Sequence, residues 1–216
     1  MFRTILYSPW TKATVFLACL VPGSLLVRRL FTGDLGPNPV ETLTHGTGDW
    51  TIYFILITLC ITPLRKILKQ PVLIRFRKML GLFAFFYGVL HFSVYMVFDH
   101  FFDFVAIVAD VIERPYITAG FLGYVLMIPL AITSTKGMIR RLGGKRWQRL
   151  HRLIYVSATA GVVHYYWLVK SDITVPLRLA VILAILFLLR LWFWVRERRE
   201  KISGRPTGKR SEATAT

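Results

Sequence analysis

Long uncharged runs of apolar residues alternate with short polar segments along most of this chain. The clearest run, Met79–Phe98, carries no charged side chain over 20 residues. That is about the length a helix needs to cross the ~30 Å hydrocarbon core of a bilayer. The pattern predicts six membrane-spanning helices: Pro9–Leu30, Trp50–Leu64 (with Gly46 as an alternative start), Met79–Phe98, Pro115–Thr135, Leu153–Val169 and Val175–Val195. The expected fold class is therefore all-α, a polytopic membrane helical bundle.

Two polar segments have expected structures of their own. The segment 99–114 carries four acids and is predicted to form a short helix at the membrane interface. The segment 201–216 turns polar and contains Gly204, Pro206 and Gly208. We expect it to be a disordered cytoplasmic tail, following one membrane domain over residues 1–200.

The positive charge lies between the apolar runs. The chain has a net charge of +17 and 55% hydrophobic residues, too apolar a composition for a soluble domain of this size. The basic residues concentrate in segments 65–78, 136–152 and the tail after Arg196. This distribution is typical of a bacterial inner-membrane protein and argues against nucleic-acid binding. Basic loops face the cytoplasm, so both termini are predicted to be cytoplasmic.

Two histidines occur deep inside apolar runs. His91 lies 13 residues after Lys78, and His164 lies 12 residues after Arg152. On two helices that both run outward, the imidazoles would reach one depth, roughly 18–20 Å along each helix. An ionisable ring inside a bilayer indicates a functional site, and neutral imidazole is a common axial ligand of haem iron. The pair therefore predicts a b-type haem in the outer half of the membrane.

Small and aromatic residues near these histidines suit a flat macrocycle. Gly88, Ala160 and Gly161 lie about one turn before the histidines, and the fourth predicted span adds Gly120 and Gly123. Tyr95, Phe98 and Trp167 are predicted to form an aromatic wall. The alternative is that the small residues serve close helix packing and that each histidine bonds a neighbouring helix.

His151 stands apart, in the cytoplasmic mouth of the fifth span. It lies 13 residues before His164, which places the two rings about 140° apart around an ideal helix. A haem at this level would need a second ligand near position 77 or 78, where the chain has Arg77 and Lys78. His151 is therefore a metal ligand with an unusual partner, a contact of a flavin or quinone, or an interfacial histidine. His45 and His100, in outer segments, are expected to be solvated.

The cytoplasmic basic residues have a sufficient explanation in topology, and a second role remains open. They would converge at one level and suit haem propionates or a flavin phosphate: Arg75, Arg77, Lys78, Arg149 and Arg152. Cys19 and Cys60 lie in apolar runs, and no C-x-x-C-H sequence is present, so any haem is bound non-covalently. No nucleophile–base pair or dinucleotide-binding glycine fingerprint appears.

Several segments together resemble a known family. They are Arg77–Leu82, Leu90–His91, Arg114–Thr118, Thr133–Thr135, Arg141–Gly143, Trp147–His151 and His164–Lys170. In order and spacing they are similar to the MsrQ family, the haem-binding membrane subunits of periplasmic protein-methionine-sulfoxide reductases, within the ferric-reductase-like transmembrane group. The resemblance covers about residues 10–195.

This resemblance implies a set of cofactors and partners. It implies b-type haem held by His91, His151 and His164, together with FMN. It also implies a periplasmic molybdopterin-containing catalytic subunit that receives electrons, and quinone or a cytoplasmic flavin reductase that donates them. The expected role is electron transfer within an oxidoreductase complex that repairs oxidised methionine. Two alternatives remain open, a self-standing ferric or quinone reductase and a cofactor-free transporter or structural membrane protein.

Overall fold

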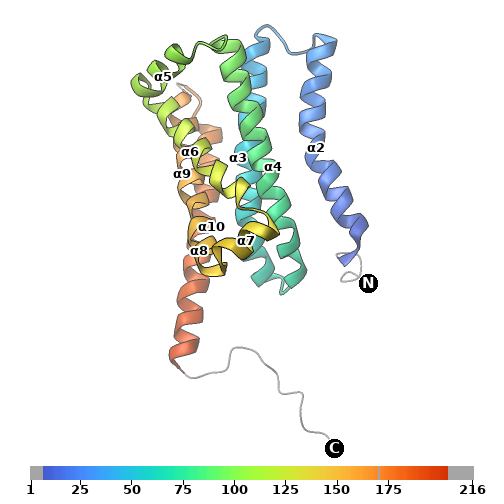
Figure 1. Cartoon of the computed structure of the whole chain (residues 1–216), viewed down its shortest axis with the longest axis vertical. Coiled ribbons are helices and arrows are strands. Elements are labelled where there is room, and N and C mark those ends of the chain that lie inside the picture. Colours follow the sequence, from blue (N-terminus) through green and yellow to red (C-terminus); the bar gives the residue numbers. More distant parts are fainter. Residues whose placement is uncertain (1–6, 170, 204–216) are drawn as a thin grey trace, which may run out of the picture.

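The computed structural model describes residues 7–169 and 171–203, and within these ranges the chain is helical and contains no strand (Figure 1). The elements are α2 (Pro9–Thr32), α3 (Pro39–Ile67), η1 (Pro71–Leu73), α4 (Ile74–Val94), η2 (Tyr95–Asp99), α5 (Phe104–Glu113), α6 (Pro115–Ile132), α7 (Lys136–Leu142), α8 (Gly144–Leu150), α9 (Leu153–Leu168) and α10 (Thr174–Ile202). The all-α prediction is confirmed.

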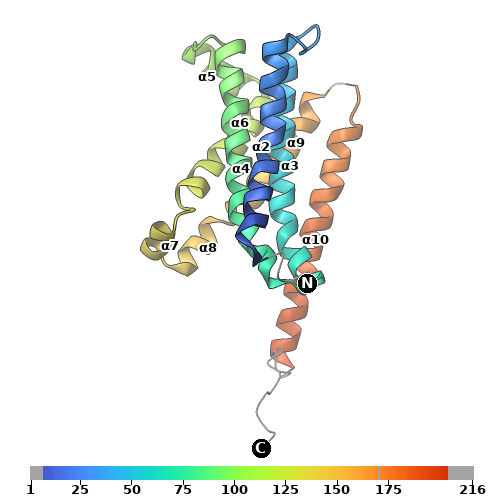
Figure 2. The same ribbon diagram turned by 90° about the vertical axis from the view of Figure 1, so that its right-hand side faces the viewer.

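Two tight helix pairs form the centre of the molecule. α3 packs along α4, and α6 packs along α9. α10 lies against α3 and α9, whereas α2 is the outermost helix and packs on α3 and α4 (Figures 1 and 2). α5 and the α2–α3 connection lie at one end of the bundle, called here the α5 end. η1, α7 and α8 lie at the opposite end, called the α7 end, where α2 starts and α10 finishes.

Five helices are long and apolar enough to cross a membrane: α2, α3, α4 with η1 and η2, α6 and α10. The fifth predicted span, α9, has 16 residues, so the six-span topology and the cytoplasmic termini stay predictions. The predicted interfacial helix is present as α5, whose start is capped by Asp103 through the N–H groups of Val105 and Ala106. Residues 204–216, most of the predicted tail, lie outside the described residues.

The second span begins earlier than predicted. α3 starts at Pro39 rather than at Trp50 or Gly46, with the Asn38 side chain accepting a hydrogen bond from the Glu41 N–H. Its polar first turns are compatible with a helix because the threonine hydroxyls donate to carbonyls one turn earlier. Thr47 donates to Leu43 and Thr51 donates to Thr47. These local hydrogen bonds satisfy the hydroxyls within the helix. The polar composition of this segment had led to a predicted start that was too late.

A buried arginine repairs a proline break in α3. Pro63 has no N–H, so the Leu59 carbonyl one turn earlier has no donor within the helix. Arg190 of α10 supplies one from Nη2, while its Nη1 donates to the Tyr155 hydroxyl at 3.0 Å. Pro63 and Leu59 are fully buried. Arg190 therefore joins α10 to α3 and α9 through a carbonyl that would otherwise be unsatisfied.

Tyr87 plays a similar part for α2. Its hydroxyl donates to the Cys19 carbonyl at 2.9 Å and accepts from the Gly23 N–H at 2.8 Å. It thus stands between the two groups that would bond each other in a regular helix, next to Pro22. The Tyr87 ring is completely buried. Because α2 has few other buried residues, this hydroxyl is its main specific link to α4.

We expect Arg190→Met to destabilise the protein by about 1–3 kcal/mol, because it leaves the Leu59 carbonyl buried without a donor. In a Pro63→Ala background the loss should be smaller, since the new N–H of residue 63 can bond that carbonyl. Thermal unfolding in detergent of both single variants and the double variant measures the coupling. Arg178→Met, on the exposed side of α10, is the control. Equal losses in both backgrounds would contradict this account.

Candidate metal-binding site

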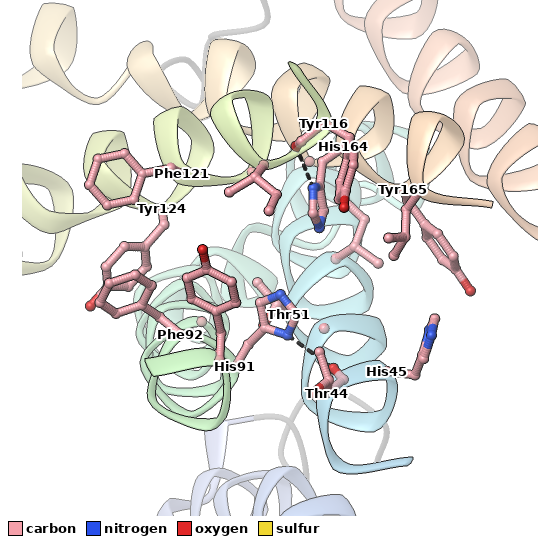
Figure 3. A pocket seen from close by; sticks show the side chains of 18 of the residues that line it. Thr44, His45, Thr51, His91, Phe92, Tyr116, Phe121, Tyr124, His164 and Tyr165 are labelled. Carbon is pink, nitrogen blue, oxygen red and sulfur yellow. Dashed lines mark hydrogen bonds between the residues drawn. The ribbon is translucent and has the colours of Figure 1, made fainter. Parts of the chain in front are cut away.

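His91 of α4 and His164 of α9 face each other across the space between the two helix pairs (Figure 3). Their ring centroids are 6.2 Å apart and the ring planes are inclined by 72°. Two imidazoles bound to one metal ion at about 2 Å each have centroids roughly 6 Å apart. The predicted pairing of these two residues is thus present in the structure, at a separation that fits a shared metal.

Each imidazole donates its Nδ1–H to a backbone carbonyl of the helix paired with its own. His91 Nδ1 lies 2.9 Å from the Thr44 oxygen of α3, and His164 Nδ1 lies 2.6 Å from the Tyr116 oxygen of α6. A carbonyl can only accept, so both nitrogens carry the proton. The Nε2 atoms are then unprotonated, which is the form that binds a metal.

A glycine opposite each histidine makes these hydrogen bonds possible. Gly48 lies one turn after Thr44, and a Cβ there would come within 3.1 Å of the His91 ring. Gly120 lies one turn after Tyr116, and a Cβ there would come within 2.7 Å of His164 Nδ1. The ring can therefore approach the backbone closely enough to reach the carbonyl. The same arrangement is used twice, once in each helix pair.

The histidines line a cavity of about 490 Å³ between α3, α4, α6 and α9. Its wall toward the middle of the bundle is apolar and includes Ile55, Gly88 and Met127. Its wall toward the α5 end is polar. Apart from His91, His164 and the tyrosines, the charged or titratable residues of the lining lie there: His45, Asp49, Asp99, His100, Asp110 and Arg114. The cavity is thus apolar at one end and charged at the other.

Asp110 of α5 organises the polar end of the cavity. Its carboxylate accepts from the Tyr95 hydroxyl at 3.2 Å and lies 3.1 Å from both His100 Nε2 and Arg114 Nε. The His100 side chain is only 14% exposed. The expectation that His100 is solvated was therefore wrong, because α5 folds back and places Asp110 against it.

Asp49 was also missed by the sequence reasoning. The early start of α3 puts this acid inside a membrane-length helix, where it lines the cavity together with Tyr165. His45, one turn earlier, lines the same side (Figure 3). A polar residue next to a predicted span was the available signal, but the predicted start at Trp50 excluded it, and only the alternative start at Gly46 included it.

The aromatic wall differs in part from the prediction. Tyr95 lines the cavity, but Phe98 and Trp167 are 43% and 54% exposed and do not. The π-helical turn η2 follows His91 and changes the direction of the side chains after it. The aromatic residues that do line the cavity come from α4, α6 and α9: Phe92, Tyr116, Phe121, Tyr124 and Tyr165.

The two glycines of the fourth predicted span make room for different groups. Gly120 makes room for the His164 ring. Gly123 makes room for the backbone of α9 at Ser157, whose hydroxyl donates to the Gly123 carbonyl at 2.8 Å. Gly88, Gly120 and Gly161 line the cavity.

The donor set restricts the kind of metal group that the cavity fits. In the described part of the chain, no three His, Cys, Asp or Glu residues lie close enough together to hold an ion. A bare transition metal held by proteins usually has at least three protein ligands. Two opposed neutral imidazoles instead suit a planar group that brings its own in-plane donors, within a cavity that has room for it.

His151 lies at the α7 end and does not line this cavity. Its Nε2 is 3.0 Å from the Thr133 hydroxyl, which itself donates to the Pro129 carbonyl, so Nε2–H is the donor. The ring stacks on Trp147 with 4.0 Å between centroids. Trp147 in turn donates to the Thr133 carbonyl. These contacts join α8 to the end of α6.

The predicted arginine contacts also lie away from the cavity. Arg77 is half-buried near His151, and Arg149 and Arg152 are exposed. None of the three lines the cavity. Their assignment to a cofactor stays a prediction.

Comparison with known proteins shows the family of this chain. The family model described as ferric reductase like transmembrane component matches residues 47–162. That range holds His91 and His151 and ends two residues before His164. A Herminiimonas arsenicoxydans protein named protein-methionine-sulfoxide reductase heme-binding subunit MsrQ is 52% identical over 88% of this chain and 88% of its own. The chain belongs to the MsrQ family.

Further relatives with the same name show similar coverage. The Rhodospirillum rubrum protein is 48% identical over 87% of this chain and 90% of its own. The Caulobacter vibrioides protein is 46% identical over 82% of this chain and 85% of its own. The MsrQ resemblance predicted from the sequence segments is therefore confirmed.

The environment of His151 gives a pH prediction. Burial lowers the pKa of His151, and the Arg77 guanidinium lowers it further. A histidine whose pKa is lower in the folded chain stabilises the fold fully above the unfolded value of about 6.5, and this contribution is lost as the pH falls below it. We expect His151→Gln to reduce the loss of stability between pH 7 and pH 5, measured by thermal unfolding in detergent. An unchanged dependence of the unfolding temperature on pH would contradict the lowered pKa of His151.

Proposed function

We propose that this chain holds one b-type haem, with His91 and His164 as its two axial ligands through Nε2. The supporting observation is the opposed pair of imidazoles, 6.2 Å apart at their centroids. Both are fixed in the Nδ1–H tautomer by backbone carbonyls. The name of the relatives, heme-binding subunit, supports the same cofactor.

The haem would supply a one-electron carrier within the membrane. The chain's own residues would hold the two imidazoles in position, exclude water with the apolar wall of the cavity, and separate the two helix pairs by the width of a planar ring. In this role the chain is a non-catalytic electron-transfer subunit. It would pass electrons to a methionine-sulfoxide reductase that repairs oxidised proteins.

The partners and location follow from the family and the charge pattern. We propose a multi-pass protein of the bacterial inner membrane with the α7 end in the cytoplasm, because the basic segments lie there. The electron donor would be quinone or a cytoplasmic flavin reductase, and the acceptor a periplasmic molybdopterin-containing catalytic subunit. The cavity lies toward the α5 end, which suits delivery to a periplasmic partner.

A second cofactor would need a different place. His151 is already bonded to Thr133 and stacked on Trp147, which favours a structural role over iron ligation. FMN, implied by the resemblance, would have its phosphate near Arg77, Arg149 and Arg152 at the α7 end. The assignment of these arginines, and of His151, to a cofactor is untested and lies outside the haem cavity.

Replacement of the histidines tests the haem assignment. We expect the purified wild type to show a low-spin b-type absorption spectrum with about one haem per chain. His91→Ala and His164→Ala should each lose the low-spin spectrum, because one axial ligand is removed. His151→Ala should retain it. A colourless wild type, or a full low-spin spectrum in His164→Ala, would refute the proposal.

The glycines opposite the ligands provide an independent test. Gly120→Ala should shift His164 and reduce the low-spin fraction strongly, because the added Cβ would lie 2.7 Å from Nδ1. Gly48→Ala should have a smaller effect, since its closest approach is 3.1 Å. Gly144→Ala, with no heavy atom within 4 Å of the added Cβ, is the matched control. Equal spectra for Gly120→Ala and this control would show that the close approach is not needed.

A further inference from the structure

The lining of the cavity around His91 and His164 changes from apolar to polar along the long axis of the bundle. Toward the middle of the bundle the cavity is closed by Ile55, Gly88 and Met127. Toward the α5 end it is lined by charged and hydrogen-bonding groups. A ligand that fills it should therefore have one apolar edge and one charged edge.

Protohaem has this character. One edge of the ring carries methyl and vinyl groups, and the other carries two propionate side chains that are ionised at neutral pH. Burying a carboxylate among apolar residues is costly, whereas pairing it with a guanidinium is favourable. The position of the cations in the wall therefore decides which way the propionates point.

Arg114 is the guanidinium of this wall. Its Nε forms an ion pair with the Asp110 carboxylate at 3.1 Å, and its Nη1 donates a hydrogen bond to the Tyr116 hydroxyl at 3.5 Å. Across the described residues, Nη2 has no hydrogen-bond partner in the protein. The Arg114 side chain is 55% exposed and lines the cavity. It can therefore donate a hydrogen bond to a second carboxylate while it keeps its ion pair with Asp110.

The acid paired with Arg114 already has its own hydrogen-bond donors. Asp110 has three of them, from Tyr95, His100 and Arg114. Asp49 and Asp99 also line this end of the cavity, and His45 offers another donor. Among the residues that line the cavity, Arg114 is the one permanent positive charge.

We propose that the haem propionates point toward the α5 end and that Arg114 binds one of them, an inference that rests on the proposed haem function. It differs from one role that the sequence left open, in which the basic residues of the α7 end suit haem propionates or a flavin phosphate. Arg77, Arg149 and Arg152 do not line the cavity. Arg114 is thus a cofactor-positioning residue, and the propionate edge is the edge nearest the α5 face.

Two measurements on the full-length protein in detergent test this orientation. The first is titration of protein produced without haem with haemin and with haemin dimethyl ester, which lacks the propionate charges. The second is the resonance Raman spectrum of the haem-loaded protein, in which the propionate bending bands report hydrogen bonding to these groups. The variants are Arg114→Gln and Arg114→Lys, with Arg28→Gln as a control arginine on α2. Arg77→Gln and Arg149→Gln test the opposite orientation.

We expect the wild type to bind haemin about tenfold or more tightly than the ester, as one charge-assisted hydrogen bond would give. Arg114→Gln should reduce this ratio toward one and shift the propionate bands while keeping the low-spin axial spectrum. Arg114→Lys should recover part of the ratio. Arg28→Gln, Arg77→Gln and Arg149→Gln should behave as the wild type.

The contrary results are distinct from a failure of the haem assignment. If Arg77→Gln or Arg149→Gln removes the preference while Arg114→Gln keeps it, the propionates face the α7 end and the proposal is wrong. An equal affinity of the wild type for haemin and its ester also overturns it. A wild type that binds neither compound refutes the proposed function itself, and the orientation with it.

Discussion

An imidazole inside a bilayer needs a hydrogen-bond acceptor for its N–H. Most backbone carbonyls of the surrounding helices already accept a hydrogen bond within their own helix. This chain meets the constraint with the second lone pair of a helix carbonyl, at Thr44 for His91 and at Tyr116 for His164. The ring can reach that carbonyl only if the residue one turn further on has no Cβ. Gly48 and Gly120 satisfy this condition. In each helix pair, α3 with α4 and α6 with α9, one helix carries the histidine and the other carries the carbonyl and the glycine.

The rest of the bundle keeps these two pairs at a fixed separation. Tyr87 holds the broken backbone of α2 against α4, and Arg190 joins α10 to the proline break of α3. At the α5 end, Asp110 ties Tyr95, His100 and Arg114 together over the cavity. These links use polar groups where the chain has few, and they leave a cavity between the pairs wide enough for a planar cofactor.

The sequence predicted the features that depend on composition and counting. The long apolar runs predicted a helical membrane protein, and the distances of His91 and His164 from basic clusters predicted their equal depth. Features that depend on helix direction or on long-range pairing were missed. Phe98 was placed in the cavity because an ideal helix returns it to the face of His91, but the π-helical turn η2 intervenes. His100 was missed because α5 folds back and places Asp110 against it. Asp49 was missed because α3 begins within a polar segment. The role of Gly48 depends on α3 and α4 being paired, which no local pattern reveals.

The central claim is that backbone hydrogen bonds fix the two imidazole planes before any cofactor is bound. Ring planes inclined by 72° should give the ferric haem protein the strongly anisotropic low-spin electron paramagnetic resonance signal of near-perpendicular imidazoles. Electron paramagnetic resonance of the oxidised wild type at liquid-helium temperature measures this directly. We predict a single low-spin species with one large g value. A rhombic low-spin signal of parallel imidazole planes, or a high-spin signal, would contradict the account.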